Sequence, residues 1–302
     1  MMTVTDHRPA QSPSRLRGGA IVAGVDGSPA SQAALQWAAA AAAETGAGLT
    51  ICHVHPETGP ADHAAAPEPE SDGILDRAVT AASRHVDRAR IAAVAAHGDT
   101  ATALIELSHG ARMVVVGTHG YFGLSARVCP PIAARVIAGA ACPVVMQTML
   151  ASGRGPFTGH VVVGVDGSAP ARRALEFGFT HAATRGLPLV AVHVTNEPAP
   201  DYWTDDTMLE TCFAAEPAAA SLLAAEAEPF EARYPDVPVK RPVVNSTVIT
   251  GLIRAAAGAA LLVVGDRGQS RTARALLGSV TDELAGAAIC PIAVIPSSGR
   301  ED

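Results

Sequence analysis

A tandem repeat constrains this chain more than any other feature of its sequence. The segment 21–28 reads Ile-Val-Ala-Gly-Val-Asp-Gly-Ser, and 140 positions later the segment 161–168 reads Val-Val-Val-Gly-Val-Asp-Gly-Ser. The His-Val pair at 53–54 returns with the same spacing, whereas the Cys-Pro pair at 142–143 returns 148 positions later. The second copy therefore carries eight extra residues between its second strand and its glycine loop. Such a duplication predicts two units of the same fold.

The length of the chain agrees with two domains, because 302 residues are about twice the usual size of one. A stretch rich in Gly, Ser and Pro at 150–158 is typical of a linker. We therefore expect a first domain at 19–149, called copy one, and a second at 159–297, called copy two. Residues 1–18 are polar and lack the apolar segment of a signal peptide, so they are predicted to form a flexible tail, as are residues 298–302.

The composition excludes several classes of protein. Hydrophobic residues make up 48% of the chain, which is typical of a globular protein, yet apolar stretches such as 255–264 are too short to cross a membrane. The formal charge of −7 disfavours nucleic acid as a partner. The five cysteines are odd in number and never spaced as Cys-x-x-Cys, which disfavours disulfides and a zinc site and favours a reducing cytoplasm.

The pattern of apolar residues predicts the α/β fold class. In both copies apolar β-branched runs alternate with Ala-rich helical stretches, as in two tandem, open, five-stranded parallel-sheet domains of the Rossmann-like kind. The first helix of each copy is predicted to begin at Ser28 or Ser168 and to end at Gly46 or Gly186. A further helical stretch at 205–233 is expected to be interrupted near Pro217. Strands are predicted near 20–25, 49–54, 91–96, 113–117 and 143–147, and near 160–165, 187–194, 237–244, 261–265 and 291–295.

The final strands of the two copies are predicted to meet. Residues 144–146 and 292–295 are short and apolar, and such strands aggregate when they are left as bare sheet edges. Within one chain the two edges can pair with each other and form a unit with pseudo-two-fold symmetry. Two such chains can then associate further.

Candidate binding residues follow the first strand of each copy. Open parallel sheets bind ligands at the carboxyl ends of their strands, and Asp26 and Asp166 lie there in identical Val-Asp-Gly-Ser turns. A carboxylate at this place can accept hydrogen bonds from ribose hydroxyls or from an adenine edge. The alternative interpretation is that Asp-Gly simply makes the turn. The sequence leaves both open.

The strongest candidate is the glycine-rich loop after the fourth strand of copy two. Its pattern, G-x2-G-x9-G-S, lets backbone N–H groups surround an anion, and a capping pattern at Ser279 adds the positive end of a helix dipole. Arginines inside the loop can add charge-assisted contacts to phosphates. The residues are Gly265, Asp266, Arg267, Gly268, Arg271, Arg274, Gly278, Ser279 and Val280.

Copy one departs from this pattern. After Gly117, Thr118, His119 and Gly120, the positions that require Gly-Ser hold Pro130 and Pro131. Proline has no N–H, so two donors to phosphate are lost together with the serine hydroxyl. Tyr121 and Phe122 are also bulkier than their counterparts in copy two, although Arg127 lies nearby. Copy one is therefore predicted to hold a weakened or empty site.

Taken together, the Val-Asp-Gly-Ser turns, the His-Val strand ends, the intact loop and the Cys-Pro final strands resemble the universal stress protein family, in its tandem, ATP-binding form with an adenine nucleotide alpha-hydrolase-like fold. The resemblance implies ATP with Mg²⁺ as cofactor, a cytoplasmic stress or dormancy role as a nucleotide-dependent regulator, a regulatory protein partner, and a homodimer through the last strands. It implies binding by Gly164, Asp166, Val194 and the loop residues of copy two, and by Gly24, Asp26, Val54, Gly117, Thr118, His119 and Gly120 of copy one.

The sequence disfavours efficient catalysis. A P-loop needs a lysine behind its glycines, and the one lysine, Lys240, lies between two prolines. We assign no catalytic residue and no metal ligand; His53 and His193 are interpreted as structural, and Cys142 and Cys290 as small buried hydrophobes. Two alternatives stay open at this point: a slow ATPase or nucleotide hydrolase of the same fold, and an interaction scaffold that binds no nucleotide.

Overall fold

The computed structural model describes residues 19–55, 69–118, 132–148, 154–195, 217–266, 284 and 290–297. Its strands follow the predicted apolar runs, with one exception in copy two. The strands of copy one are β1 (Ala20–Gly24), β2 (Leu49–His55), β3 (Ile91–His97), β4 (Ala111–Thr118) and β5 (Val144–Thr148). The strands of copy two are β6 (Val161–Gly164), β7 (Leu189–Thr195), β8 (Val239–Lys240), β9 (Val243–Asn245), β10 (Leu261–Gly265) and β11 (Ile292–Ile295).

Helices connect parallel neighbours such as β1 and β2 or β6 and β7, which is the connection that parallel strands require. Copy one contains α1 (Pro29–Thr45), α2 (Pro69–Ala82), the short 3-10 helix η2 (Arg88–Arg90), α3 (Thr100–Ser108) and α4 (Ile132–Gly139). Copy two contains α5 (Ala169–Arg185), α7 (Pro217–Arg233) and α8 (Val248–Ala256). The predicted α/β class is confirmed.

The first helix of each copy begins and ends as predicted. The Ser28 hydroxyl accepts the Ser31 N–H at 3.2 Å, and Ser168 caps α5 through the N–H of Ala171 at the same distance. Gly46 and Gly186 end the two helices with φ of +66° and +64°. Only glycine adopts this left-handed conformation without strain, which explains why each helix stops there.

One predicted strand of copy two was wrong. The sequence predicted a continuous strand at 237–244, but the structure has two short strands, β8 and β9, on either side of Pro242. Both pieces pair with β7. Proline fixes φ and lacks the N–H that a ladder needs, so the strand breaks where it occurs. The predicted interruption at Pro217 coincides with the first residue of α7; residues 196–216 lie outside the described part of the chain.

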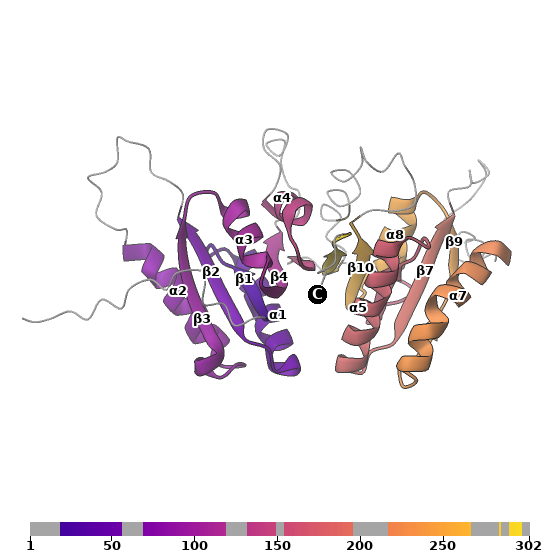
Figure 1. Ribbon diagram of the computed structural model, residues 1–302, viewed down its shortest axis with the longest axis horizontal. Helices are drawn as coiled ribbons and strands as arrows, with labels where there is room; N and C mark the ends of the chain where they lie inside the picture. Colours follow the sequence, from indigo (N-terminus) through magenta and orange to yellow (C-terminus); the bar gives the residue numbers. More distant parts are fainter. Residues whose placement is uncertain are drawn as a thin grey trace, which may run out of the picture.

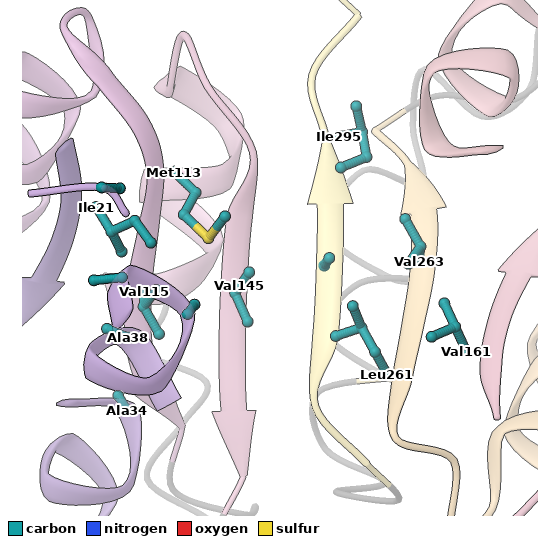
Figure 2. Packing of buried hydrophobic residues seen from close by; sticks show 14 of the residues in the cluster. Ile21, Ala34, Ala38, Met113, Val115, Val145, Val161, Leu261, Val263 and Ile295 are labelled. Carbon is teal, nitrogen blue, oxygen red and sulfur yellow. The ribbon is translucent and has the colours of Figure 1, made fainter. Parts of the chain in front are cut away.

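The strands form one mixed sheet that runs through both copies, in the order β3-β2-β1-β4-β5-β11-β10-β6-β7-β8, with β9 also paired to β7. Strands are parallel within each copy, and β5 and β11 pair antiparallel, with Val145 opposite Ala293. Figure 2 shows these two strands pointing in opposite directions. The predicted internal pairing is confirmed.

Because β5 and β11 each have both neighbours in the same chain, neither offers an open edge to a second chain, contrary to the expected dimer contact.

Two apolar clusters cover the two faces of this sheet, and each extends over both copies. Alternation along a strand sends Ile21 and Ala23 to one face and Val22 to the other. The first face packs against α1, α2, α5 and α7, and the second against α3, α4 and α8. Figure 1 shows α1 and α5 on the same side of the sheet, next to the junction of the copies. On each face of the sheet, the apolar core therefore continues from one copy into the other.

Candidate functional site

The carboxyl ends of β6, β7 and β10 lie side by side in copy two. β6 pairs with β10 and with β7, and all three strands run parallel. Gly164 ends β6 and Gly265 ends β10, so Asp166 and Asp266 follow neighbouring strands at the same edge of the sheet. Gly24, Asp26 and Gly117 take the equivalent places in copy one. The structure thus brings these predicted residues together.

The Val-Asp-Gly-Ser turns have the same geometry in both copies. The carboxylate of Asp166 accepts the N–H of Ser168 at 3.0 Å, and Asp26 accepts the N–H of Ser28 at 2.9 Å. Each aspartate therefore closes a turn with its own side chain immediately before a helix. The turn interpretation is confirmed. That these carboxylates also receive ribose hydroxyls stays a prediction.

A histidine on the neighbouring strand holds each turn from behind. His53 Nδ1 lies 2.7 Å from the carbonyl oxygen of Val25, and His193 Nδ1 lies 2.6 Å from that of Val165. A carbonyl only accepts, so Nδ1 carries the proton and donates in both copies. The structural interpretation of these histidines is confirmed. The sequence signal for this contact is that each histidine lies 27 residues after the aspartate of its turn in both copies.

Successive residues of β7 direct their backbone N–H and C=O groups alternately toward β9 and toward β6. His193 donates its N–H to the carbonyl of Pro242, on the β9 side, at 3.2 Å. The carbonyl of Val192, one residue earlier, accepts the N–H of Val165 on the β6 side at 2.8 Å. Val194 therefore directs its N–H and C=O toward the β6 side, where β6 has already ended. A planar ligand with a donor and an acceptor on one edge can pair with such a strand end.

Copy one repeats this arrangement. The carbonyl of Cys52 accepts the N–H of Val25 at 2.8 Å, and the carbonyl of His55 accepts the N–H of Gly98 on the opposite side at 2.9 Å. By the same alternation Val54 faces the side where β1 has ended. The edge that would hold a nucleoside is thus built alike in both copies.

Gly265, which ends β10, and Gly117, one residue before the end of β4, have a packing role of their own. A Cβ on Gly265 would lie 2.6 Å from Pro170 Cβ, and one on Gly117 would lie 2.4 Å from the carbonyl carbon and oxygen of Ala30. Both approaches are closer than atoms tolerate. Only glycine lets the first turn of α5 or α1 lie directly on the strand end. This contact places a helix N-terminus next to the start of each predicted phosphate loop.

Asp266 forms hydrogen bonds with the residues at and just after the end of β11. Its N–H donates to the carbonyl of Ile295 at 2.8 Å, and its carboxylate accepts the N–H of Ser297 at 2.7 Å. Arg173 of α5 donates to the carbonyls of Pro296 and Ser297. The carboxylate of Asp266 thus has a structural task at the end of β11. Thr118, the copy-one counterpart, contacts the carbonyl of Gln147 at 3.4 Å.

An ion pair that the sequence analysis missed joins α3 to α4 in copy one. Arg135 donates to both oxygens of Asp99, at 2.7 and 2.8 Å, and Asp99 also caps α3 through the Thr102 N–H. The hydrogen bonds from Arg135, and then those from Thr102, hold the pKa of Asp99 well below its usual range. At the same place in copy two Thr247 caps α8 without a side-chain hydrogen bond to the backbone. Nothing in the spacing of Asp99 and Arg135 would have indicated this pair.

Several predicted site residues lie outside the described part of the chain. They are Arg267, Gly268, Arg271, Arg274, Gly278, Ser279 and Val280 of copy two, and His119, Gly120, Tyr121, Phe122, Arg127, Pro130 and Pro131 of copy one. Among the described residues, no group of three His, Cys, Asp or Glu side chains is arranged to hold a metal ion. Over the same residues, no helix has the length and apolar character needed to cross a membrane.

The described cysteines behave as buried apolar residues. Cys52, Cys142 and Cys290 are buried and form no disulfide. Burial raises the pKa of the Cys52 thiol to about 11 and that of Cys290 to about 12, so both stay protonated at neutral pH. The predicted role of Cys142 and Cys290 as small hydrophobes is confirmed.

The fold and its repeated turns define an α/β protein of two tandem units that share one sheet. The model of the universal stress protein family matches residues 19–147 and again residues 158–296. The chain therefore belongs to the universal stress protein family. A curated relative, universal stress protein Rv2005c of Mycobacterium tuberculosis (strain ATCC 25618 / H37Rv), is 33% identical over 294 residues, which cover 92% of this chain and 97% of the relative.

Solved structures agree with this fold. A universal stress protein from Archaeoglobus fulgidus DSM 4304 superposes with a TM-score of 0.65 at 18% identity, over 94% of this chain and 97% of that one. Another universal stress protein, solved in complex with cAMP, is 24% identical with a TM-score of 0.38, over 43% of this chain and 96% of that one. The cAMP belongs to that protein, and a likeness at this TM-score places no ligand in this chain.

Proposed function

We propose that this chain is a nucleotide-dependent regulator that binds adenine nucleotide, as ATP with Mg²⁺, mainly in copy two. One observation carries the proposal: the G-x2-G-x9-G-S pattern begins at Gly265, where a buried parallel strand ends against a helix N-terminus. Backbone N–H groups after such a strand favour polyphosphate, because they donate to it without the cost of burying a charged side chain. The residues of the pattern after Asp266 lie outside the described part of the chain, so they support the proposal by their sequence alone.

The nucleoside end of the proposed site rests on the described residues. The turn fixed by His193 holds Asp166 in one orientation, so its carboxylate is preorganised toward a ribose. The N–H and C=O of Val194 face the same side and can pair with an adenine edge. Preorganisation lowers the entropy lost on binding. Mg²⁺ would be held by the phosphates together with oxygen ligands of the loop, because hard divalent ions prefer oxygen.

Copy one shares the nucleoside end and lacks the phosphate donors. Pro130 and Pro131 stand where the pattern of copy two has Gly278 and Ser279. Each lost charge-assisted hydrogen bond costs about 1.5–3 kcal/mol. We therefore propose a weak or empty site in copy one, and one dominant nucleotide per chain.

The regulatory role concerns the stress or dormancy response in the cytoplasm. In this role nucleotide occupancy changes the affinity for a protein partner. The chain would act as a homodimer, through a surface other than the paired β5 and β11. Size-exclusion chromatography with light scattering, with and without Mg-ATP, measures the oligomeric state, and a monomer at all concentrations removes the homodimer from the proposal.

Two measurements on the same purified chain test the binding itself. Mass spectrometry of the ligand released by denaturation should identify adenine nucleotide, and calorimetry of stripped protein with Mg-ATP should give close to one site per chain. Absence of released nucleotide together with no heat at millimolar Mg-ATP contradicts the proposal. Incubating the loaded protein and measuring ADP separates a regulator, which keeps its ATP, from the slow nucleotide hydrolase.

A further inference from the structure

The two copies touch through an aromatic stack outside the proposed nucleotide site. The imidazole of His181 on α5 lies nearly parallel to the indole of Trp37 on α1, with ring centroids 5.8 Å apart and planes 8° apart. It is also nearly parallel to Phe177, one turn away on α5, at 6.2 Å and 10°. Trp37 and Phe177 are equivalent positions of the repeat. His181 has no such counterpart, because copy one has Ala41 there.

Two charged groups face this stack. The guanidinium of Arg185, one turn beyond His181 on α5, lies over the Trp37 ring at 5.4 Å from its centroid. Its Nε donates to the carboxylate of Glu44 on α1 at 2.8 Å. α1 packs mainly on β1, β4 and β5, and α5 mainly on β6, β10 and β11; in these strands the one charged group is Arg112, an exposed residue of β4. The helix α7, which also packs against α5, pairs its Glu226 and Arg233 with Arg172 and Glu176 of α5. Arg185 is thus the cation at the stack, and Glu44 is the carboxylate that pairs with it.

His181 is held in its neutral form by this environment. Its Nε2 atom is buried and has no hydrogen-bond partner among the described residues. Burial, and then the positive charge of Arg185, lower the pKa of His181 to about 4. An imidazolium here would place an N–H without an acceptor in an apolar contact and a second cation beside Arg185. The neutral ring, in contrast, stacks against two aromatic side chains at no such cost.

We propose that the contact between α1 and α5 is an acid-released clasp, in which protonation of His181 separates the imidazole from Trp37 while the β5–β11 pairing holds the copies together. The clasp opens because the charged imidazolium is hydrated by water when it is exposed, whereas it is not hydrated within the stack. The sheet stays intact because Val145 and Ala293, which pair across the junction, are fully buried and do not titrate. This device goes beyond nucleotide binding and requires no ligand.

The fluorescence of Trp37 tests the clasp directly. The chain has two tryptophans, so Trp203→Phe leaves Trp37 as the single reporter. As the pH falls from 7 to 3.5, we expect a red shift of its emission and easier quenching by acrylamide, centred near pH 4, with a constant far-UV circular dichroism. His181→Phe in the same background keeps a stacked ring without a proton site and should show no shift. An equal shift in that variant, or no shift in the parent, overturns the proposal.

A second variant keeps the test sharp if His181→Phe does not fold. Glu44→Gln retains His181 and removes the carboxylate that pairs with Arg185. If His181 is the trigger, Trp37 stays stacked at pH 7 and its shift moves to lower pH, because the imidazolium loses a stabilising charge. If protonation of Glu44 is the trigger, Trp37 is released already at pH 7 and no acid shift follows, which contradicts the proposal.

Discussion

Copy one and copy two are alike at the nucleoside edge and different at the phosphate loop. Both close the aspartate turn, at 2.9 and 3.0 Å, and both hold it with a histidine, at 2.7 and 2.6 Å. Only copy two continues into G-x2-G-x9-G-S. A feature present in both copies, including the one whose sequence lacks the Gly-Ser pair, is explained by the fold. A feature present in one copy is the better indicator of a ligand.

This comparison changes the weight of the individual residues. Gly265 and Gly117 allow the same close approach of a helix, so neither glycine alone argues for nucleotide. The aspartate turns likewise have a task without a ligand. Gly278 and Ser279, which copy one replaces by prolines, carry the functional argument.

The largest effect is expected where the copies join. Val145 is fully buried on β5 opposite Ala293, so Val145→Asp places a carboxylate in the shared core, at a cost of about 3–4 kcal/mol in the free energy of unfolding. Ala92→Asp on the exposed edge strand β3 is the matched control and should cost less than about 0.5 kcal/mol. Urea denaturation measures both. Equal losses would mean that the junction is not part of one core.

Exchanging the loops should reverse the difference between the copies. Gly278→Pro with Ser279→Pro removes two N–H donors and a hydroxyl, and should weaken Mg-ATP binding by about 100-fold or more. Pro130→Gly with Pro131→Ser makes the reciprocal change and should strengthen copy one, against the bulk of Tyr121 and Phe122. Calorimetry gives both affinities, and thermal unfolding shows whether each variant is folded. Two equal, tight sites in the unaltered chain would refute the asymmetry.

Much of the fold followed from local rules. Serine caps and C-terminal glycines predicted both ends of α1 and α5, and apolar runs placed the strands within about two residues. The junction was predicted from two short apolar strands that needed partners. The break in the strand did not follow from the apolar pattern, because Val239, Val243 and Val244 continue it on both sides of Pro242, whereas the proline interrupts the ladder.

The site was predictable only in part. Spacing indicated which residues reach the carboxyl edge, because a parallel sheet collects all strand ends there. It did not indicate that His193 donates to Val165, or that Arg135 pairs with Asp99, since such contacts depend on distances between separate elements. Nor did it indicate that Asp266 holds Ser297, which lies 31 residues away along the chain. Long-range partners require the packed structure.

A medium effect is expected at the histidines behind the turns. His193→Ala and His53→Ala each remove a donor to a turn carbonyl, and each should lower the free energy of unfolding by about 1–3 kcal/mol. Only His193→Ala should also weaken Mg-ATP binding, because only copy two carries the intact loop. His109→Ala, at an exposed position, is the control. If His53→Ala weakens Mg-ATP binding as much as His193→Ala does, copy one also takes part in nucleotide binding. That outcome contradicts the assignment of the ligand to copy two.

The smallest expected effect is a loss of folding stability at acidic pH that arises from His181, a residue of copy two only. The pKa of folded His181 is about 4, below the ordinary value near 6.5, so the unfolded chain binds more protons between these values. Its contribution to stability is therefore fully present above pH 6.5 and is lost as the pH falls toward 4. Because part of the ring meets solvent, we expect a loss of about 1–2 kcal/mol, less than the full shift implies. Urea denaturation at pH 7 and pH 4.5 should show this loss in the unaltered chain and a smaller one in His181→Phe. Copy one has Ala41 at this position and cannot contribute in the same way. If His181→Phe loses as much stability between pH 7 and pH 4.5 as the unaltered chain does, the acid sensitivity comes from other groups.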